Sequence, residues 1–128
     1  MIPKFRAWTE EGEVMYYDVY PCKDDTLLLS YDETAFDEVP ASDFILMQST
    51  GREDKNGKEI FEGDVVKYED GRNTYTEEVV YDKDLAGFGV KDAKANMIFT
   101  FGELAEDISL HSLEVIGNIY ENPGLSGE

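Results

Sequence analysis

The stretch NGKEIFEGDVV, from Asn56 to Val66, has the residue types of an ion-binding or phosphate-binding loop. It brings an asparagine, three acidic side chains and two glycines into one short segment. A helix–loop–helix calcium loop needs oxygen ligands at fixed positions and a bidentate glutamate at the twelfth. With Asp54 in the first position, Lys58 occupies the fifth and Val65 the twelfth. This spacing excludes a calcium loop of that type.

The glycines around this stretch do not form a phosphate loop either. Five residues separate Gly51 from Gly57, where the phosphate-loop motif has four, and Glu59 stands where a magnesium-binding hydroxyl is required. Asn56-Gly57 is instead the preferred dipeptide of a type I′ turn, in which both residues have positive φ. Gly63-Asp64 predicts a second turn or a bulge. The stretch is therefore expected to be architecture and not a reactive centre.

Other residues with catalytic chemistry lack partners in the sequence. His111 is the single histidine and Cys22 the single cysteine. Ser112 follows His111 directly, and neighbouring residues on a strand point to opposite faces, so the two do not form a hydrolase pair if the segment is extended. With 29 acidic residues, some carboxylates will lie close together by chance in any fold, so a pair of carboxylates does not by itself indicate a catalytic site. We expect no catalytic residue, no cofactor and no metal site.

The net charge of −18 indicates the kind of partner that the protein disfavours. Binding a phosphate backbone requires cations that neutralise it, so direct binding of nucleic acid is disfavoured, as is an anionic membrane surface. No apolar run is long enough to cross a bilayer, and the N-terminal residues lack a signal-peptide pattern. These features predict a cytoplasmic protein.

Short β-type runs separated by turn residues predict a mostly β fold. We expect one domain of short antiparallel strands in a barrel or stacked-meander arrangement, spanning residues 1–122, with a flexible tail over residues 123–128. Residues 32–40 are expected to be an acidic loop, and residues 103–110 contain the one helical pattern. The expected strands are residues 4–9, 14–20, 26–31, 43–49, 60–61, 65–68, 74–81, 88–91, 97–101 and 113–120.

Four segments together resemble the YopX-like family of phage and prophage proteins. They are KFRAW from Lys4, MYYD from Met15, LMQSTGREDKNGKEIFEGDVVKY from Leu46, and EVIGNIYENPGL from Glu114. The resemblance implies a mostly β fold, a phage or prophage origin, a bacterial host cytoplasm and, in some relatives, oligomers. It carries no catalytic residue. The polar family positions that packing alone does not require form the candidate interaction surface. These residues are Gln48, Thr50, Asp54, Asn118, Glu121 and Asn122.

The sequence thus favours a non-enzymatic accessory protein that binds another protein. Two alternatives stay open. Dense carboxylates can imitate the phosphates of nucleic acid, so the protein could occupy a host DNA-binding protein. A carboxylate- or metal-dependent hydrolase is the enzymatic alternative.

Overall fold

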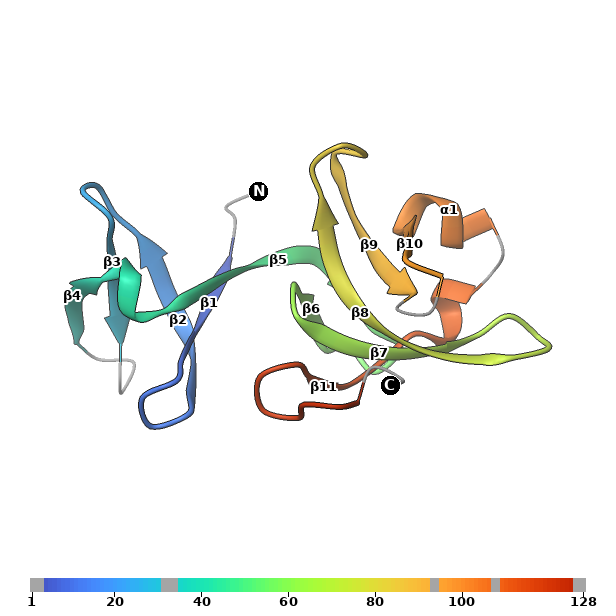
Figure 1. Ribbon diagram of the computed structural model, residues 1–128, viewed down its shortest axis with the longest axis horizontal. Coiled ribbons are helices and arrows are strands. Elements are labelled where there is room, and N and C mark those ends of the chain that lie inside the picture. Colours follow the sequence, from blue (N-terminus) through green and yellow to red (C-terminus); the bar gives the residue numbers. More distant parts are fainter. Residues whose placement is uncertain (1–3, 31–34, 93–94, 107–108, 126–128) are drawn as a thin grey trace. The chain divides into compact units, whose positions relative to one another are not determined.

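The computed structural model describes residues 4–30, 35–92, 95–106 and 109–125. The chain divides into two compact units, Met1–Ser49 and Thr50–Glu128. Within the described residues, antiparallel strands form two sheets that do not close into a barrel, and one short α-helix accompanies them (Figure 1). The prediction of a mostly β fold with at most one short helix is confirmed.

The first unit is built on a meander that β5 completes. The strands lie in the order β4-β3-β2-β1-β5, and each strand is antiparallel to the strand beside it. Past Ser49, β5 continues into the second unit, where β6 lies beside it. The elements are β1 (Phe5–Thr9), β2 (Val14–Pro21), β3 (Thr26–Ser30), β4 (Phe36–Pro40), the 3-10 turn η1 (Ala41–Asp43) and β5 (Ile45–Glu53).

Alternation along these strands places one set of apolar side chains on a shared face. Ala7, Val19, Leu27 and Leu29 form the buried cluster of the first unit, and the partly buried rings of Tyr16 and Phe44 pack near it. The β1–β2 register shifts between Phe5 and Ala7, which marks a bulge in the pairing.

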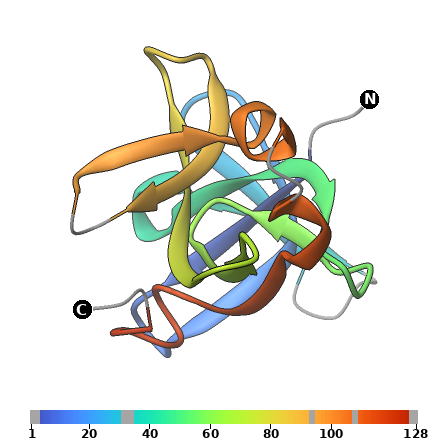
Figure 2. The same cartoon turned by 90° about the vertical axis from the view of Figure 1, so that its right-hand side faces the viewer.

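The second unit contains a sheet in the order β10-β9-β8-β7-β11. The strands β7 to β10 form a meander, and β8 and β9 curve along their length (Figure 2). The elements are β6 (Glu59–Phe61), β7 (Asp64–Glu69), β8 (Thr74–Asp82), β9 (Gly87–Asp92), β10 (Met97–Thr100), α1 (Phe101–Glu106), η2 (Ser109–Ser112) and β11 (Glu114–Asn118).

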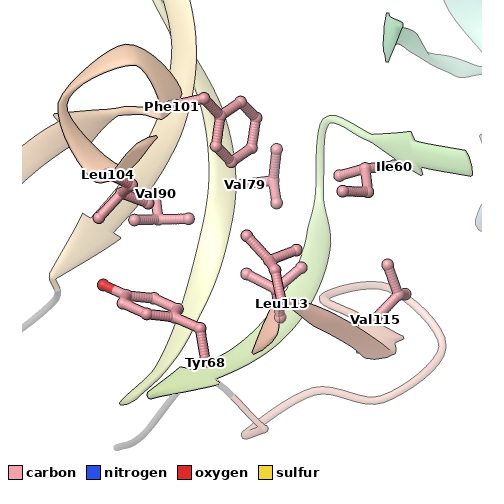
Figure 3. Close-up of a cluster of buried hydrophobic side chains, with 9 residues drawn as sticks. Ile60, Tyr68, Val79, Val90, Phe101, Leu104, Leu113 and Val115 are labelled. Atoms are coloured by element: carbon pink, nitrogen blue, oxygen red, sulfur yellow. The ribbon is translucent and has the colours of Figure 1, made fainter. Parts of the chain in front are cut away.

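The helix α1 contributes to the core of this second unit. Phe101 and Leu104 are three residues apart, so both lie on one helical face, and they lie beside Val79 and Val90 of the sheet (Figure 3). Burying an aliphatic or aromatic side chain of this size stabilises a fold by about 1.5–3 kcal/mol. The full buried cluster is Ile60, Val66, Tyr68, Val79, Val90, Phe101, Leu104, Leu113 and Val115.

Two local predictions were wrong. Residues 36–40, expected to belong to an acidic loop, form the strand β4. Asp and Glu are poor strand formers, but an edge strand tolerates them because one side of it faces water. Residues 32–34 of the same predicted loop lie outside the described residues.

The turn at Asn56-Gly57 was also predicted with the wrong type. Gly57 has φ +81°, whereas Asn56 is not among the residues with positive φ. The amide of Gly57 donates to the carbonyl of Asp54 (3.0 Å), and the amide of Asp54 donates to the carbonyl of Lys58 (2.8 Å). This is a three-residue hairpin loop that ends in a left-handed glycine, which is the next most common solution after type I′.

Candidate binding site

An open hollow of about 280 Å³ lies at one end of the sheet in the first unit. Four segments line it: the end of β1, the β1–β2 turn, the turn η1 and the start of β5. We call this feature the acidic hollow, because three of its residues carry carboxylates. Its lining residues are Trp8, Thr9, Glu10, Glu11, Ser42, Asp43, Phe44 and Ile45.

The β1–β2 turn places Glu10 and Glu11 at the hollow. The amide of Glu13 donates to the carbonyl of Glu10 (3.3 Å), and Gly12 takes φ +85°. A turn with positive φ at its third residue favours glycine there. The chain can therefore reverse immediately after β1, which leaves two consecutive acidic side chains exposed at the sheet end.

The turn η1 brings the third carboxylate, Asp43, to the same hollow. Pro40 precedes η1 with φ −64° and ψ 131°, and the amide of Phe44 closes the turn on the carbonyl of Ala41 (3.0 Å). Phe44 then packs edge-on against Tyr16, with 6.1 Å between the ring centroids. The apolar ring anchors the segment, so Asp43 stays exposed beside it.

Apolar surface accompanies the three carboxylates. Trp8 is only 5% exposed, so most of its ring is covered, whereas Ile45 beside it is exposed. In the sheet, Trp8 pairs with Met15 on one side and with Ile45 on the other. Carboxylates next to aromatic rings suit an alkyl chain that ends in a cation, because the chain packs on the rings and the cation meets the negative charge.

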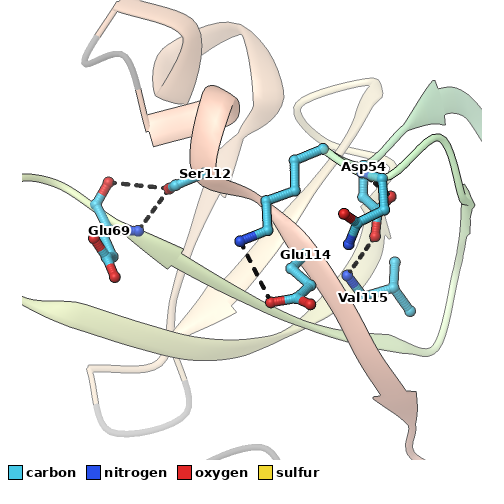
Figure 4. Close-up of polar contacts among 7 residues, drawn as sticks. Asp54, Glu69, Ser112, Glu114 and Val115 are labelled. Carbon is cyan, nitrogen blue, oxygen red and sulfur yellow. Dashed lines mark hydrogen bonds and ion pairs between the residues drawn. The ribbon is translucent and has the colours of Figure 1, made fainter.

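Asp54 fixes the conformation at the start of the stretch from Asn56 to Val66, whose residue types suggested a reactive loop. Asp54 is 7% exposed, and its side chain accepts hydrogen bonds from the amides of Asn56, Lys58 and Val115, each 2.9 Å long. Figure 4 shows the bond to Val115. Burial alone would raise the pKa of Asp54, but these backbone donors and the nearby Lys58 outweigh it, so the pKa lies below its ordinary value. Asp54 therefore holds the hairpin loop onto β11.

Lys55 adds two further contacts between the loop and the C-terminal part of the unit. Its amide donates to the carbonyl of Leu113 (2.9 Å), and its ammonium group lies 3.6 Å from the carboxylate of Glu114 (Figure 4). Both charged side chains are substantially exposed, so this ion pair contributes at most about 1 kcal/mol. The prediction that the stretch builds architecture fits this geometry.

The structure brings together three of the six residues predicted for an interaction surface. Asn118 is buried, and its side chain binds the turn that follows β11. Its oxygen accepts from the amides of Tyr120 (3.0 Å) and Glu121 (2.8 Å), and its nitrogen donates to the carboxylate of Glu121 (2.8 Å). Glu121 and Asn122 are exposed in the same turn.

The other three predicted residues lie elsewhere. The hydroxyl of Thr50 donates to the carbonyl of Ile60 (2.8 Å), and Asp54 is buried in its loop. Gln48 is half-buried in the part of β5 that belongs to the first unit. The role of these six residues in binding stays a prediction.

One pair of titratable groups lies inside the core of the second unit. The hydroxyl of Tyr68 donates to the carboxylate of Glu77, and the two side chains are 5% and 6% exposed. Burial raises the pKa of Glu77, and burial together with the bond to Glu77 raises that of Tyr68. Tyr75 stacks on Tyr68 with 5.1 Å between the ring centroids. The pair satisfies a buried polar group within packed side chains.

Two further observations concern the described residues. No group of three or more His, Cys, Asp or Glu side chains among them is arranged to hold a metal ion. No helix in this part of the chain has the length and hydropathy needed to cross a bilayer.

Sequence reasoning missed the acidic hollow. The residues that line it, Trp8 to Glu11 and Ser42 to Ile45, are separated by more than thirty positions in the chain. The pairing of β1 with β5 brings them together, and no periodicity within either segment reports that pairing. The only local signal is the Glu10-Glu11 pair beside the single tryptophan.

Comparison with known proteins identifies relatives of this architecture. The family model described as YopX protein matches residues 4–125. The crystal structure of protein EF1440 from Enterococcus faecalis is 30% identical, with a TM-score of 0.65 and 98% of each chain covered. Protein yopX from Bacillus subtilis is 24% identical, with a TM-score of 0.63, and the match covers 95% of this chain and 96% of that one. No curated protein matches the chain.

Proposed function

The chain belongs to the YopX family, and from that premise we propose that it is a non-enzymatic accessory protein of a phage or prophage that binds a basic segment of another protein. The observation that supports this proposal is the acidic hollow. Three carboxylates and two aromatic rings line a space of about 280 Å³. A lysine or arginine side chain carries the alkyl stem and the cation that such a lining complements.

The charge of the whole chain acts in the same direction. At −18 it attracts basic partners over a distance and accelerates their encounter, while the hollow supplies the local recognition. Exposed apolar side chains in the first unit provide contact area for a protein partner. They are Val14, Tyr17, Tyr20, Phe36, Ile45 and Leu46.

Charge neutralisation within the acidic hollow tests this proposal. The triple variant Glu10→Gln, Glu11→Gln, Asp43→Asn keeps the shape of the side chains and removes their charge. We expect it to weaken binding of an oligolysine peptide of about nine residues on the order of tenfold, since each exposed ion pair contributes up to about 1 kcal/mol. Isothermal titration calorimetry measures the change.

A matched triple variant separates local recognition from overall charge. Glu53→Gln, Glu69→Gln, Asp84→Asn removes three charges from exposed residues of the second unit, so both variants have the same net charge. We expect this control to weaken binding by less than about threefold, as surface charges acting through solvent do. Equal losses in the two variants would mean that the peptide responds to net charge alone, and the acidic hollow would lose its role.

A further inference from the structure

The edge strand β4 of the first unit carries unused backbone hydrogen-bonding groups. In the described part of the chain, β4 is the terminal strand of its sheet and pairs only with β3. An edge strand presents a row of amides and carbonyls on which an extended segment can pair as an additional strand. Which residues of β4 present these groups follows from the hydrogen-bond pattern.

One backbone hydrogen bond fixes which residues of β4 bond to β3. The amide of Ala41 donates to the carbonyl of Asp25 (2.8 Å), and the register continues without a shift to Ser30 opposite Phe36. In an antiparallel ladder, every second residue points its backbone groups to the same neighbour. Asp37 and Val39 therefore bond to β3, whereas Phe36 and Glu38 direct their amides and carbonyls outward. Pro40 offers a carbonyl only, which limits the docking length at that end.

The side chains beside this edge indicate which residue types a binding segment would carry. Phe36 is 44% exposed and Tyr20 is 48% exposed, and their rings lie against each other with 5.7 Å between centroids. They form an apolar contact surface next to the open edge. Asp37 and Glu38, both exposed, add negative charge on the two faces of the strand, and β4 contains no basic residue.

This charge argues against a second copy of the chain as the occupant. Two β4 strands paired edge to edge would bring Asp37 and Glu38 of one copy close to the same residues of the other, and like charges opposite each other destabilise a ladder. An extended segment with basic side chains makes the opposite, attractive contact. An apolar residue in that segment can cover Phe36.

We propose that β4 is a docking edge on which a basic, extended segment of a partner protein adds as a further antiparallel or parallel strand, held by the backbone groups of Phe36 and Glu38. This inference rests on the proposed protein-binding function and names how the partner is held. Main-chain hydrogen bonds supply affinity, and the acidic and aromatic side chains select the sequence.

Amide hydrogen exchange tests the inference at individual residues. The probes are two peptides of about nine residues with equal charge, a lysine–valine peptide in which the two residues alternate and the same peptide N-methylated at every backbone amide. Only the first can form a strand, because the methyl groups remove every backbone donor. We expect the unmodified lysine–valine peptide to slow exchange at the amides of Phe36 and Glu38 at least about tenfold, and the N-methylated peptide to leave both unchanged.

The variant Glu38→Pro removes the outward donor at the centre of the edge. A proline is tolerated at an edge position whose amide faces water, so the fold is expected to persist, as thermal unfolding will show. We expect binding of the lysine–valine peptide to weaken on the order of fivefold to tenfold for one lost backbone bond. Glu38→Gln removes the charge and keeps the backbone donor, so its affinity for the peptide is expected to fall by less.

The possible outcomes separate this inference from the proposed function. Binding of both peptides without protection at Phe36 and Glu38 overturns the docking edge and leaves the basic-partner function standing. If neither peptide binds, both the docking edge and the basic-partner function are overturned. Protection of the two amides that grows with protein concentration in the absence of peptide means that a second copy occupies the edge, and this also overturns the inference.

Discussion

At the scale of single residues, Asp54 is the most informative side chain of the second unit. Its carboxylate accepts hydrogen bonds from backbone amides of its own loop and of β11. These bonds give the segment between Arg52 and Val66 a structural role. The acidic and glycine residues that suggest an ion-binding loop instead form a hairpin turn. A buried carboxylate surrounded by backbone donors stabilises the fold as long as it remains charged.

The substitution Asp54→Asn is expected to lower the free energy of unfolding by about 2 kcal/mol at neutral pH. The amide group of asparagine has one acceptor oxygen where the carboxylate has two, so at least one buried donor loses its partner. Urea denaturation measures the change. Asp84→Asn, at an exposed position, is expected to change stability by less than about 0.5 kcal/mol.

The stability of the wild type and of Asp54→Asn should respond differently to acid. Because the pKa of Asp54 is lower in the folded protein than in the unfolded chain, its stabilisation is present above about pH 4 and is lost as the pH falls through the folded-state pKa. The stability difference between the wild type and Asp54→Asn should therefore shrink on acidification. A difference that is constant down to pH 2 would show that the charge of Asp54 has no such role.

At the scale of elements, close approach between β9 and β10 depends on Gly89. The residue lies opposite Thr100, and a Cβ atom added to it would fall against the carbonyl oxygen of Phe99 and 2.8 Å from the Cα atom of Thr100. These are backbone atoms, so no side-chain rotation relieves the overlap. Glycine within a strand marks such a close approach.

Gly89→Ala is therefore expected to destabilise the protein by about 1–3 kcal/mol, as other overpacking substitutions do. The matched control is Gly102→Ala in α1, where an added Cβ atom would lie 3.8 Å from the Thr100 hydroxyl oxygen, its nearest contact beyond the adjoining residues and the helix backbone. Alanine favours a helix over glycine by up to about 1 kcal/mol, so this variant is expected to be neutral or stabilised. Thermal unfolding followed by circular dichroism compares the two. Similar losses of stability in the two variants would mean that the close approach of Gly89 to the backbone of β10 does not cause the destabilisation.

The elements also show what sequence patterns can predict. Alternation and β-branched or aromatic residues located most strands, including Val14–Pro21 and Thr74–Asp82, because side-chain period and burial agree there. They failed at β4, where two acidic residues mask a strand whose stability comes from pairing with β3. The turn type predicted at Asn56-Gly57 was also wrong, because the contacts of Asp54 with two amides of its own loop and with the distant amide of Val115 select the loop geometry. Local propensity yields to tertiary contacts in both cases.

At the scale of the whole molecule, the charge predicts the sign of the partner but not the place where it binds. The acidic hollow depends on the pairing of β1 with β5, and the docking edge depends on which strand ends the sheet. Both are properties of topology, which no single segment encodes. Of the six residues predicted for an interaction surface, Glu121 and Asn122 lie in or beside the turn after β11, and Asn118, the last residue of β11, binds that turn. The hypothesis of nucleic-acid mimicry stays a prediction.

The emission of Trp8 is the most direct test of the central claim that the acidic hollow receives a basic segment. It is the only tryptophan of the chain and lines the hollow, so its fluorescence reports occupancy without a label. We predict a saturable change in emission on titration with oligolysine, none with oligoglutamate, and a weaker affinity at higher salt because exposed charges are screened. Unchanged emission at saturating oligolysine, or the same response to both peptides, would contradict the account.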